Sequence, residues 1–172
     1  MVYNELTTIS GLDYHKLKQA LTIFEKLFLV KFITPYYTNK RIEISKNPKV
    51  FFLDTGLRSA LLGDFKPLQE RIDKGSLYEN YIFCAFHKKD KNVKYYRSKS
   101  GAEIDFIIED CAPVEVKSKL SQKKVSRSFQ NYIDKYHPIR GIIFNENLSG
   151  TINHELGKVL FLPHFMAEKS ML

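Results

Sequence analysis

Residues 101–117 constrain the fold of this chain more than any other segment. They read GAEIDFIIEDCAPVEVK, in which two stretches rich in aliphatic and aromatic residues flank a polar stretch at residues 109–111. This pattern is typical of a β-hairpin with a short polar loop. Because side chains alternate faces along a strand, Ile104, Phe106 and Ile108 are expected on one face of the first arm, with the acidic residues on the other.

The polar face of this hairpin is expected to bring two carboxylates together. A loop centred on Asp110 places Asp105 directly across from Glu115, and opposed side chains have Cβ atoms about 4.5–5.5 Å apart. Two carboxylates at that spacing repel each other by roughly 3 kcal/mol at an effective dielectric constant of about 20. A favourable cross-strand pair contributes only about 0.2–1 kcal/mol. Lys117, a shared proton or a divalent cation would neutralise the pair.

The donor atoms favour a particular class of metal. Asp105 and Glu115 offer hard oxygen ligands, which suit Mg²⁺ or Mn²⁺ better than zinc. Lys117 beside such an ion would orient or deprotonate a metal-bound water, which is the equipment for hydrolysing a phosphodiester. The alternative interpretation is a surface hairpin with a cross-strand Lys–Glu pair that contributes little to stability.

The first 63 residues predict a winged-helix-like module. Residues 3–9 have helical spacing, Gly11 interrupts it, and Asp13 is a good N-cap for a second helix that ends near Leu27. Helix, glycine-containing turn and helix form the helix-turn-helix pattern. Because a winged helix normally has another helix before this pair, we expect the first helix to be missing and the chain to be the C-terminal part of a longer polypeptide.

A basic wing is expected after these helices. Residues 29–33 and 41–44 read as two strands around a turn, and the wing would carry Lys40, Arg41 and Lys49 as contacts to nucleic acid. A winged helix also docks onto other proteins, so both kinds of partner remain open.

The remainder, residues 75–172, predicts a second domain after a polar linker. Expected helices at residues 76–87 and 126–136 alternate with strands at residues 93–97, in the hairpin and at residues 139–144. The resulting order is α-β-β-β-α-β. The whole chain is therefore of the α/β class.

Composition favours an anionic partner and excludes several classes of protein. The net charge is +8 at pH 7, which points to DNA, although a solvated charged face is the plain alternative. No apolar run is long enough to cross a membrane, no signal peptide opens the chain, and a cytoplasmic setting is the default. Cys84 and Cys111 suggest neither a disulfide framework nor a zinc site. No P-loop motif occurs, so the chain is not itself a P-loop ATPase.

The acidic residues resemble the signature of the PD-(D/E)XK nuclease superfamily, an acidic residue followed after a variable gap by (D/E)-x-K. Three surrounding segments are similar to one family, the nuclease-like C-terminal region of prokaryotic AAA-type ATPases, a domain of unknown function; they are Lys94–Phe106, Lys49–Leu57 and Leu77–Asn80. The resemblance covers roughly residues 6–166. It implies a restriction-endonuclease-like core and an AAA-type ATPase region as a partner, and several copies of the chain could assemble.

The resemblance also implies further site residues. Glu79 matches a glutamate that the superfamily often places on the helix before the first core strand, where it would hold a metal through water or orient Lys117. Ser76-Leu-Tyr-Glu79 is equally a capping box, in which the glutamate bonds back to the N-cap amide. Glu103 would support the metal, or balance Lys94 or Arg97 on the next strand.

Three polar side chains near the hairpin are candidate contacts to DNA. Lys119 and Lys124 would contact backbone phosphates, which contribute affinity without sequence information. Gln130 lies on the following helix, where related nucleases carry a polar residue near the phosphate.

Three functions compete on these grounds. The first is a Mg²⁺-dependent (or Mn²⁺-dependent) DNA phosphodiesterase attached to a DNA-binding winged helix. The second is a catalytically inactive DNA- or partner-binding module that regulates the ATPase. A free-standing transcription regulator is the weakest, because it leaves the carboxylate hairpin unexplained.

Overall fold

The computed structural model describes residues 3–36, 47–98, 101–109, 111–154 and 157–169, and the protein is a mixed α/β structure. Its elements follow in this order: α1 (Tyr3–Ser10), α2 (Tyr14–Lys26), β1 (Val30–Ile33), β2 (Lys49–Phe52), α4 (Thr55–Leu62), the 3-10 helix η1 (Leu68–Glu70), α5 (Lys74–His87), β3 (Val93–Arg97), β4 (Glu103–Ile108), β5 (Ala112–Val116), α6 (Arg127–Tyr136), β6 (Arg140–Asn145), β7 (Gly150–His154), β8 (Gly157–Pro163) and α7 (Met166–Lys169).

Six strands form one mixed sheet in the order β3-β4-β5-β6-β8-β7. The pairs β5–β6 and β6–β8 are parallel, and the remaining neighbours are antiparallel. From α5 to β6 the elements follow the predicted order α-β-β-β-α-β. The edge strand β7 and the short helix α7 were not predicted.

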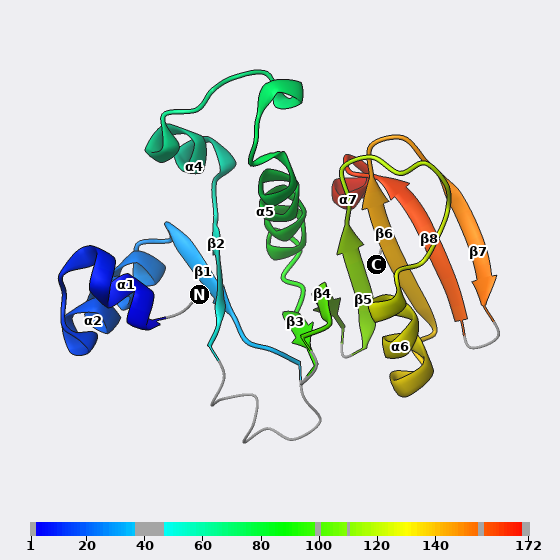
Figure 1. Cartoon of the computed structure of the whole chain (residues 1–172), viewed down its shortest axis with the longest axis horizontal. Coiled ribbons are helices and arrows are strands. Elements are labelled where there is room, and N and C mark those ends of the chain that lie inside the picture. The colour runs from blue at the N-terminus through cyan, green and yellow to red at the C-terminus, as the bar shows by residue number, and fades with distance from the viewer. Residues whose placement is uncertain (1–2, 37–46, 99–100, 110, 155–156, 170–172) are drawn as a thin grey trace.

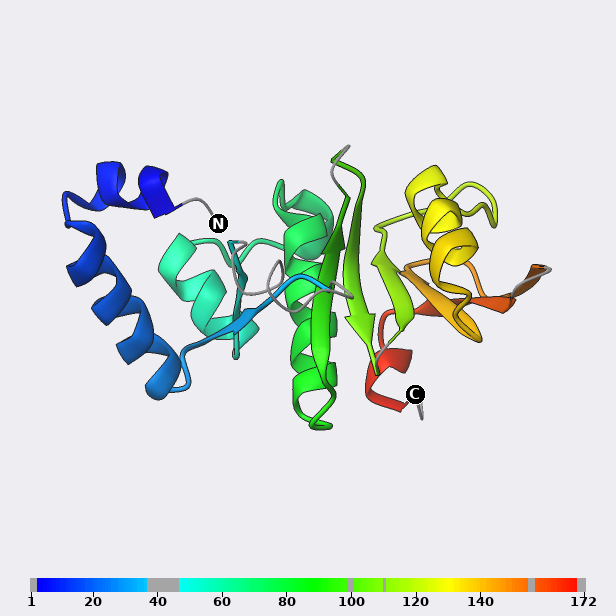
Figure 2. The same ribbon diagram turned by 90° about the horizontal axis from the view of Figure 1, so that it is seen from below.

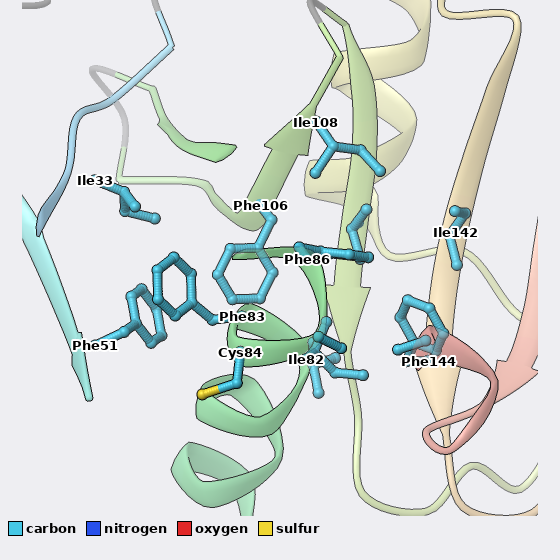
Figure 3. Close-up of a cluster of buried hydrophobic side chains, with 14 of the residues drawn as sticks. Ile33, Phe51, Ile82, Phe83, Cys84, Phe86, Phe106, Ile108, Ile142 and Phe144 are labelled. Carbon is cyan, nitrogen blue, oxygen red and sulfur yellow. The ribbon is translucent and has the colours of Figure 1, made fainter. Parts of the chain in front are cut away.

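Helices α5 and α6 cover opposite faces of the sheet, as Figures 1 and 2 show. On the α5 face, Phe83 and Phe86 pack with Phe106 of β4 and Phe144 of β6 (Figure 3). On the α6 face, Phe129 and the residues around it pack against the other sides of the same strands. The sheet is therefore buried on both faces, which explains its nearly continuous apolar strands.

The N-terminal segment shares the core of the sheet. Ile33 of β1 and Phe51 of β2 belong to the α5-side cluster, and the Phe51 ring stacks on Phe83 with 4.7 Å between centroids (Figure 3). Asn80 of α5 holds the backbone of Phe52 with two hydrogen bonds. Its Nδ2 donates to the Phe52 carbonyl at 2.8 Å, and its Oδ1 accepts from the Phe52 amide at 2.9 Å. Helix α5 thus joins the two segments.

The two N-terminal helices form largely as predicted. Asp13 caps α2 by accepting from the Lys16 amide at 2.9 Å. The helical spacing of Leu17, Leu21, Phe24 and Phe28 predicts a buried apolar face. This prediction is wrong in part, because only Leu17 is buried, whereas Phe24 and Phe28 are 44% and 78% exposed. Phe28 lies beyond the end of the helix, at a positive φ of 56°.

The small N-terminal sheet pairs β1 with β2 in antiparallel register. The predicted return strand at residues 41–44 lies outside the described residues, as do Lys40 and Arg41. Within the described part of the chain, no helix is long and apolar enough to cross a membrane.

Helix α5 begins at Lys74, two residues earlier than predicted. Asp73 precedes it, and its carboxylate pairs with Arg71, whose Nε and Nη2 each donate at 2.9 Å. Ser76 therefore lies inside the first turn, and the predicted capping box with Glu79 is wrong. Arg71, in the predicted polar linker, is 7% exposed and also donates to Ser59 of α4. The linker is therefore hydrogen-bonded to the N-terminal segment.

The double hydrogen bond of Asn80 gives the first prediction. Asn80→Ala leaves the buried backbone groups of Phe52 without their side-chain partner, and we expect it to lower the free energy of unfolding by about 2–4 kcal/mol. Chemical denaturation measures the change. Ser76→Ala, at an exposed position of the same helix, is the matched control and should change stability little; equal effects of the two substitutions would contradict the role of Asn80.

Candidate functional site

Strand β4 contains a bulge at Asp105. Its pairing with β3 shifts register between Lys94↔Ile107 and Tyr96↔Ile104. Asp105 and Phe106 consequently lie opposite the single residue Tyr95. A bulge bends its strand locally and turns a side chain in a new direction, here that of Asp105.

The bulge changes which apolar residues share a face. Phe106 and Ile108 pack on the α5 side, whereas Ile104 packs with Ile107 on the α6 side. The prediction that Ile104, Phe106 and Ile108 share one face is therefore wrong for Ile104. Strict alternation fails there because one extra residue is inserted between paired positions.

The hairpin has the register expected for a loop centred on Asp110. Phe106 pairs with Val114 and Ile108 with Ala112, which centres the hairpin on residue 110. The Asp105 carboxylate accepts a hydrogen bond from the Val116 amide at 2.8 Å. One oxygen of Asp105 is thereby anchored to the backbone of the strand that carries Glu115.

Glu115 is 3% exposed and oriented by the start of α6. Ser126 donates its hydroxyl to Glu115 Oε1 at 2.6 Å, while the same hydroxyl caps the helix by accepting from the Phe129 amide at 3.1 Å. Lys117 Nζ lies 3.5 Å from Glu115 Oε2, so the two members of the E-x-K pattern face each other. Burial raises the pKa of Glu115, and the nearby Asp105 carboxylate raises it further.

Glu79, on α5, interacts electrostatically with Asp105. Burial, and then the charge of Asp105, raise the pKa of Glu79 to about 7, while Lys49 and Lys117 act in the opposite direction. Burial also raises the pKa of Asp105. Since Asp105 influences Glu79 on one side and Glu115 on the other, it is the acid shared by both parts of the site.

Glu103 is neutralised by two cations. Arg97 donates from Nε and Nη2 to Glu103 Oε2 at 2.9 and 2.8 Å, which confirms the expectation that Glu103 balances Arg97. Lys49 of β2 forms an ion pair with the other oxygen. Although burial opposes the change, the hydrogen bond from Lys49 lowers the pKa of Glu103.

The candidate contacts to nucleic acid lie in different places. Lys119 and Lys124 are exposed in the connection between β5 and α6, where a large anion can reach them. Gln130 donates to Asp134 Oδ1 at 2.9 Å along α6. Lys49, expected on a wing, instead has a side chain only 20% exposed against the acidic residues. The position of Lys49 depends on how β2 packs against the rest of the protein. No local pattern in the sequence indicates this packing, so the position could not be predicted.

A cavity of about 780 Å³ lies beside Glu79 and Lys49. Most of its wall is apolar and comes from the N-terminal segment, including Leu21, Phe24, Val50, Phe52, Leu57 and Leu61. Of the acids described above, Glu79 lines this cavity, whose wall is formed by both segments.

The donor chemistry of the site fits a hard divalent cation. Within the described ranges, no group of three His, Cys, Asp or Glu side chains gathers around a common point. Mg²⁺ does not require such a group, because it is usually held by one or two carboxylates with waters and substrate phosphates. The raised pKa values of the half-buried Asp105 and Glu79 and of the buried Glu115 show that partial loss of solvent disfavours their charged forms, which a cation would stabilise.

The fold and this cluster define a mixed α/β protein with an acidic site at the end of a β-hairpin, beside the helix that joins its two segments. The family model described as a domain of unknown function, DUF4143, matches residues 74–164, more than half of the chain, and the protein belongs to the DUF4143 family. A second model of a domain of unknown function, DUF8612, matches residues 1–68. No curated protein and no solved structure matches the chain.

The buried Glu79 carboxyl predicts a pH-dependent stability. Because its pKa rises from 4.5 to about 7 on folding, its stabilising contribution is present below pH 4.5 and is lost as the pH rises through 7. Relative to wild type, Glu79→Gln should therefore gain stability between pH 5 and pH 8, by at most about 3 kcal/mol. Urea unfolding at both pH values measures this; Glu70→Gln, at an exposed position, should keep the wild-type slope. Parallel pH profiles for wild type and Glu79→Gln would contradict the assignment.

Proposed function

We propose that the protein is a Mg²⁺-dependent DNA phosphodiesterase with a restriction-endonuclease-like core. The observation that carries this proposal is the position of Asp105, whose charge acts on Glu79 of α5 and on Glu115 of β5, together with Lys117 at 3.5 Å from Glu115. Buried acids with perturbed pKa values, next to a cation and a cavity, are typical of functional sites. The element order α-β-β-β-α-β supports the nuclease-like fold.

Each residue has a distinct role in the proposed reaction. Asp105 and Glu115 would hold Mg²⁺ or Mn²⁺, with Glu79 acting through water. When bound, the ion would supply Lewis-acid stabilisation and a more acidic water. Lys117 would position the attacking water and offset the charge that develops on the phosphate. The Val116 amide and the Ser126 hydroxyl keep Asp105 and Glu115 in fixed orientations, which lowers the cost of organising the site.

Basic residues around the site would hold the DNA. Lys119 and Lys124 are exposed in the connection that follows Lys117 along the chain, and they would contact backbone phosphates. The N-terminal segment, with the winged-helix-like order that the sequence predicts, would extend the contact through Lys40 and Arg41. The phosphate contacts would contribute affinity and little sequence preference.

A specific observation favours the second candidate function, a catalytically inactive module that binds a partner such as an AAA-type ATPase region. Large apolar side chains are exposed on and after the N-terminal helices, among them Ile9 at 83%, Leu27 at 60% and Phe28 at 78%. Large exposed apolar side chains occur at protein interfaces, where a partner covers them. The two functions are compatible with each other, and cleavage of DNA separates them.

Metal-dependent cleavage is the direct test of the nuclease proposal. With Mg²⁺ or Mn²⁺, the wild-type protein should nick or linearise plasmid DNA, and Asp105→Asn or Lys117→Ala should lower the rate at least about a hundredfold, because each removes a group that stabilises the transition state. Gel electrophoresis against time measures the rates.

Asp90→Asn is the matched control for Asp105→Asn. It exchanges the same groups at an exposed position with φ 52°, a conformation that asparagine tolerates, and should keep the wild-type rate. Intact plasmid with wild type under all metal conditions, or equal cleavage by Asp105→Asn, would leave only the inactive-module function.

Salt dependence tests the phosphate contacts separately from catalysis. Binding of a short DNA duplex in EDTA should weaken as the salt concentration rises. Lys119→Gln and Lys124→Gln should each reduce the slope of log K against log[salt] by about 0.9, because binding by either variant releases one counterion fewer from the DNA. Fluorescence anisotropy measures the slopes. Lys66→Gln, at an exposed position between α4 and η1, is the control; identical slopes in all four proteins would show that these two lysines do not contact DNA.

A further inference from the structure

Lys49 belongs to the N-terminal segment, yet its ammonium group lies at the acidic site of the other segment. It comes from the first residue of β2 and pairs with Glu103, two residues before Asp105. The ammonium also lies 5.2 Å from the centre of the Tyr95 ring, on β3. The side chain is 20% exposed, compared with 43% for Lys117 and 62% for Arg97, so it is the least exposed of these three cations.

Tyr95 holds the chain at two points before Lys49. Its hydroxyl donates to the Asn47 carbonyl at 2.7 Å, two residues before Lys49. Its carbonyl accepts from the Tyr36 amide at 2.6 Å, just after β1. The position of the ammonium is therefore set by the packing of the small N-terminal sheet on β3 rather than by a flexible side chain alone.

The charge of Lys49 acts on three acids, two on β4 and one on α5. It favours the ionised forms of Glu103, Asp105 and Glu79, which is the effect that a bound cation would have. A cation shielded from solvent interacts more strongly with its neighbours than an exposed one. In the absence of metal, Lys49 thus partly offsets the repulsion between the carboxylates.

We propose that Lys49 is the built-in counter-ion of the acidic site, so that a divalent cation binds there in competition with it. This inference rests on the proposed function, because it assumes that the acids bind a metal. It makes Lys49 a positioning residue for the metal and makes the site dependent on both segments of the chain. By linkage, any anion that draws Lys49 away from Glu103 tightens metal binding.

The test compares Lys49→Gln with Lys31→Gln, which removes the same charge from the neighbouring strand β1, where Lys31 pairs with Glu25 at 2.8 Å. Calorimetric titration with Mn²⁺ should show roughly fivefold tighter binding for Lys49→Gln, because a positive charge near the ion is gone, and no change for Lys31→Gln. Lys49→Arg keeps the charge and should retain the wild-type affinity. Equal or weaker binding by Lys49→Gln would overturn the proposal.

A second measurement separates this inference from the proposed function. In EDTA, Lys49→Gln should lower the midpoint of thermal unfolding more than Lys31→Gln, and the difference should shrink when Glu103→Gln is also present. If neither the wild type nor any variant binds Mn²⁺, the proposed metal site and the competition for it are both wrong. The thermal unfolding data would still decide whether Lys49 is the counter-ion of the acids. Equal melting losses for Lys49→Gln and Lys31→Gln overturn that role whatever the metal result.

Discussion

The packing of Phe83 between two β-elements is the contact on which the rest of the structure depends. Its ring stacks on Phe51 of β2 and also contacts Phe106 of β4, with centroids 4.7 and 6.4 Å away. One buried side chain of α5 thereby joins the N-terminal sheet to the main sheet. Because Glu79 and Asn80 lie on the same helix, this contact also determines the position of the Glu79 carboxyl and of the Asn80 side chain that is hydrogen-bonded to Phe52.

Charge is the second constraint, since the fold buries acids that repel one another. The Ser126 hydroxyl, the Val116 amide and the ammonium groups of Lys117 and Lys49 each offset part of this cost. These groups come from three places in the chain: β2, the end of β5 with the residue that follows it, and the start of α6. A protein that needed only stability would be served better by apolar residues at these positions, so the retained acids favour a role in chemistry.

Local signals in the sequence were sufficient for most elements and for the core of the site. The hairpin register, the cap at Asp13 and the E-x-K pair follow from patterns within a few residues. The bulge at Asp105 could not be predicted, because it depends on pairing with β3. The place of Lys49 and the earlier start of α5 depend on long-range contacts of Phe51 and Arg71, which leave no periodic signal.

Adjacent residues of α5 have different roles, and this limits insertions and deletions within the helix. Asn80 is hydrogen-bonded to Phe52 of β2, whereas Glu79 interacts with Asp105 of β4. Adding or deleting one residue earlier in the helix would rotate everything after it by roughly 100° relative to what comes before. Related chains should therefore keep a constant spacing between Asp73 and Asn80, whereas the exposed connection at residues 121–124 can lengthen or shorten freely.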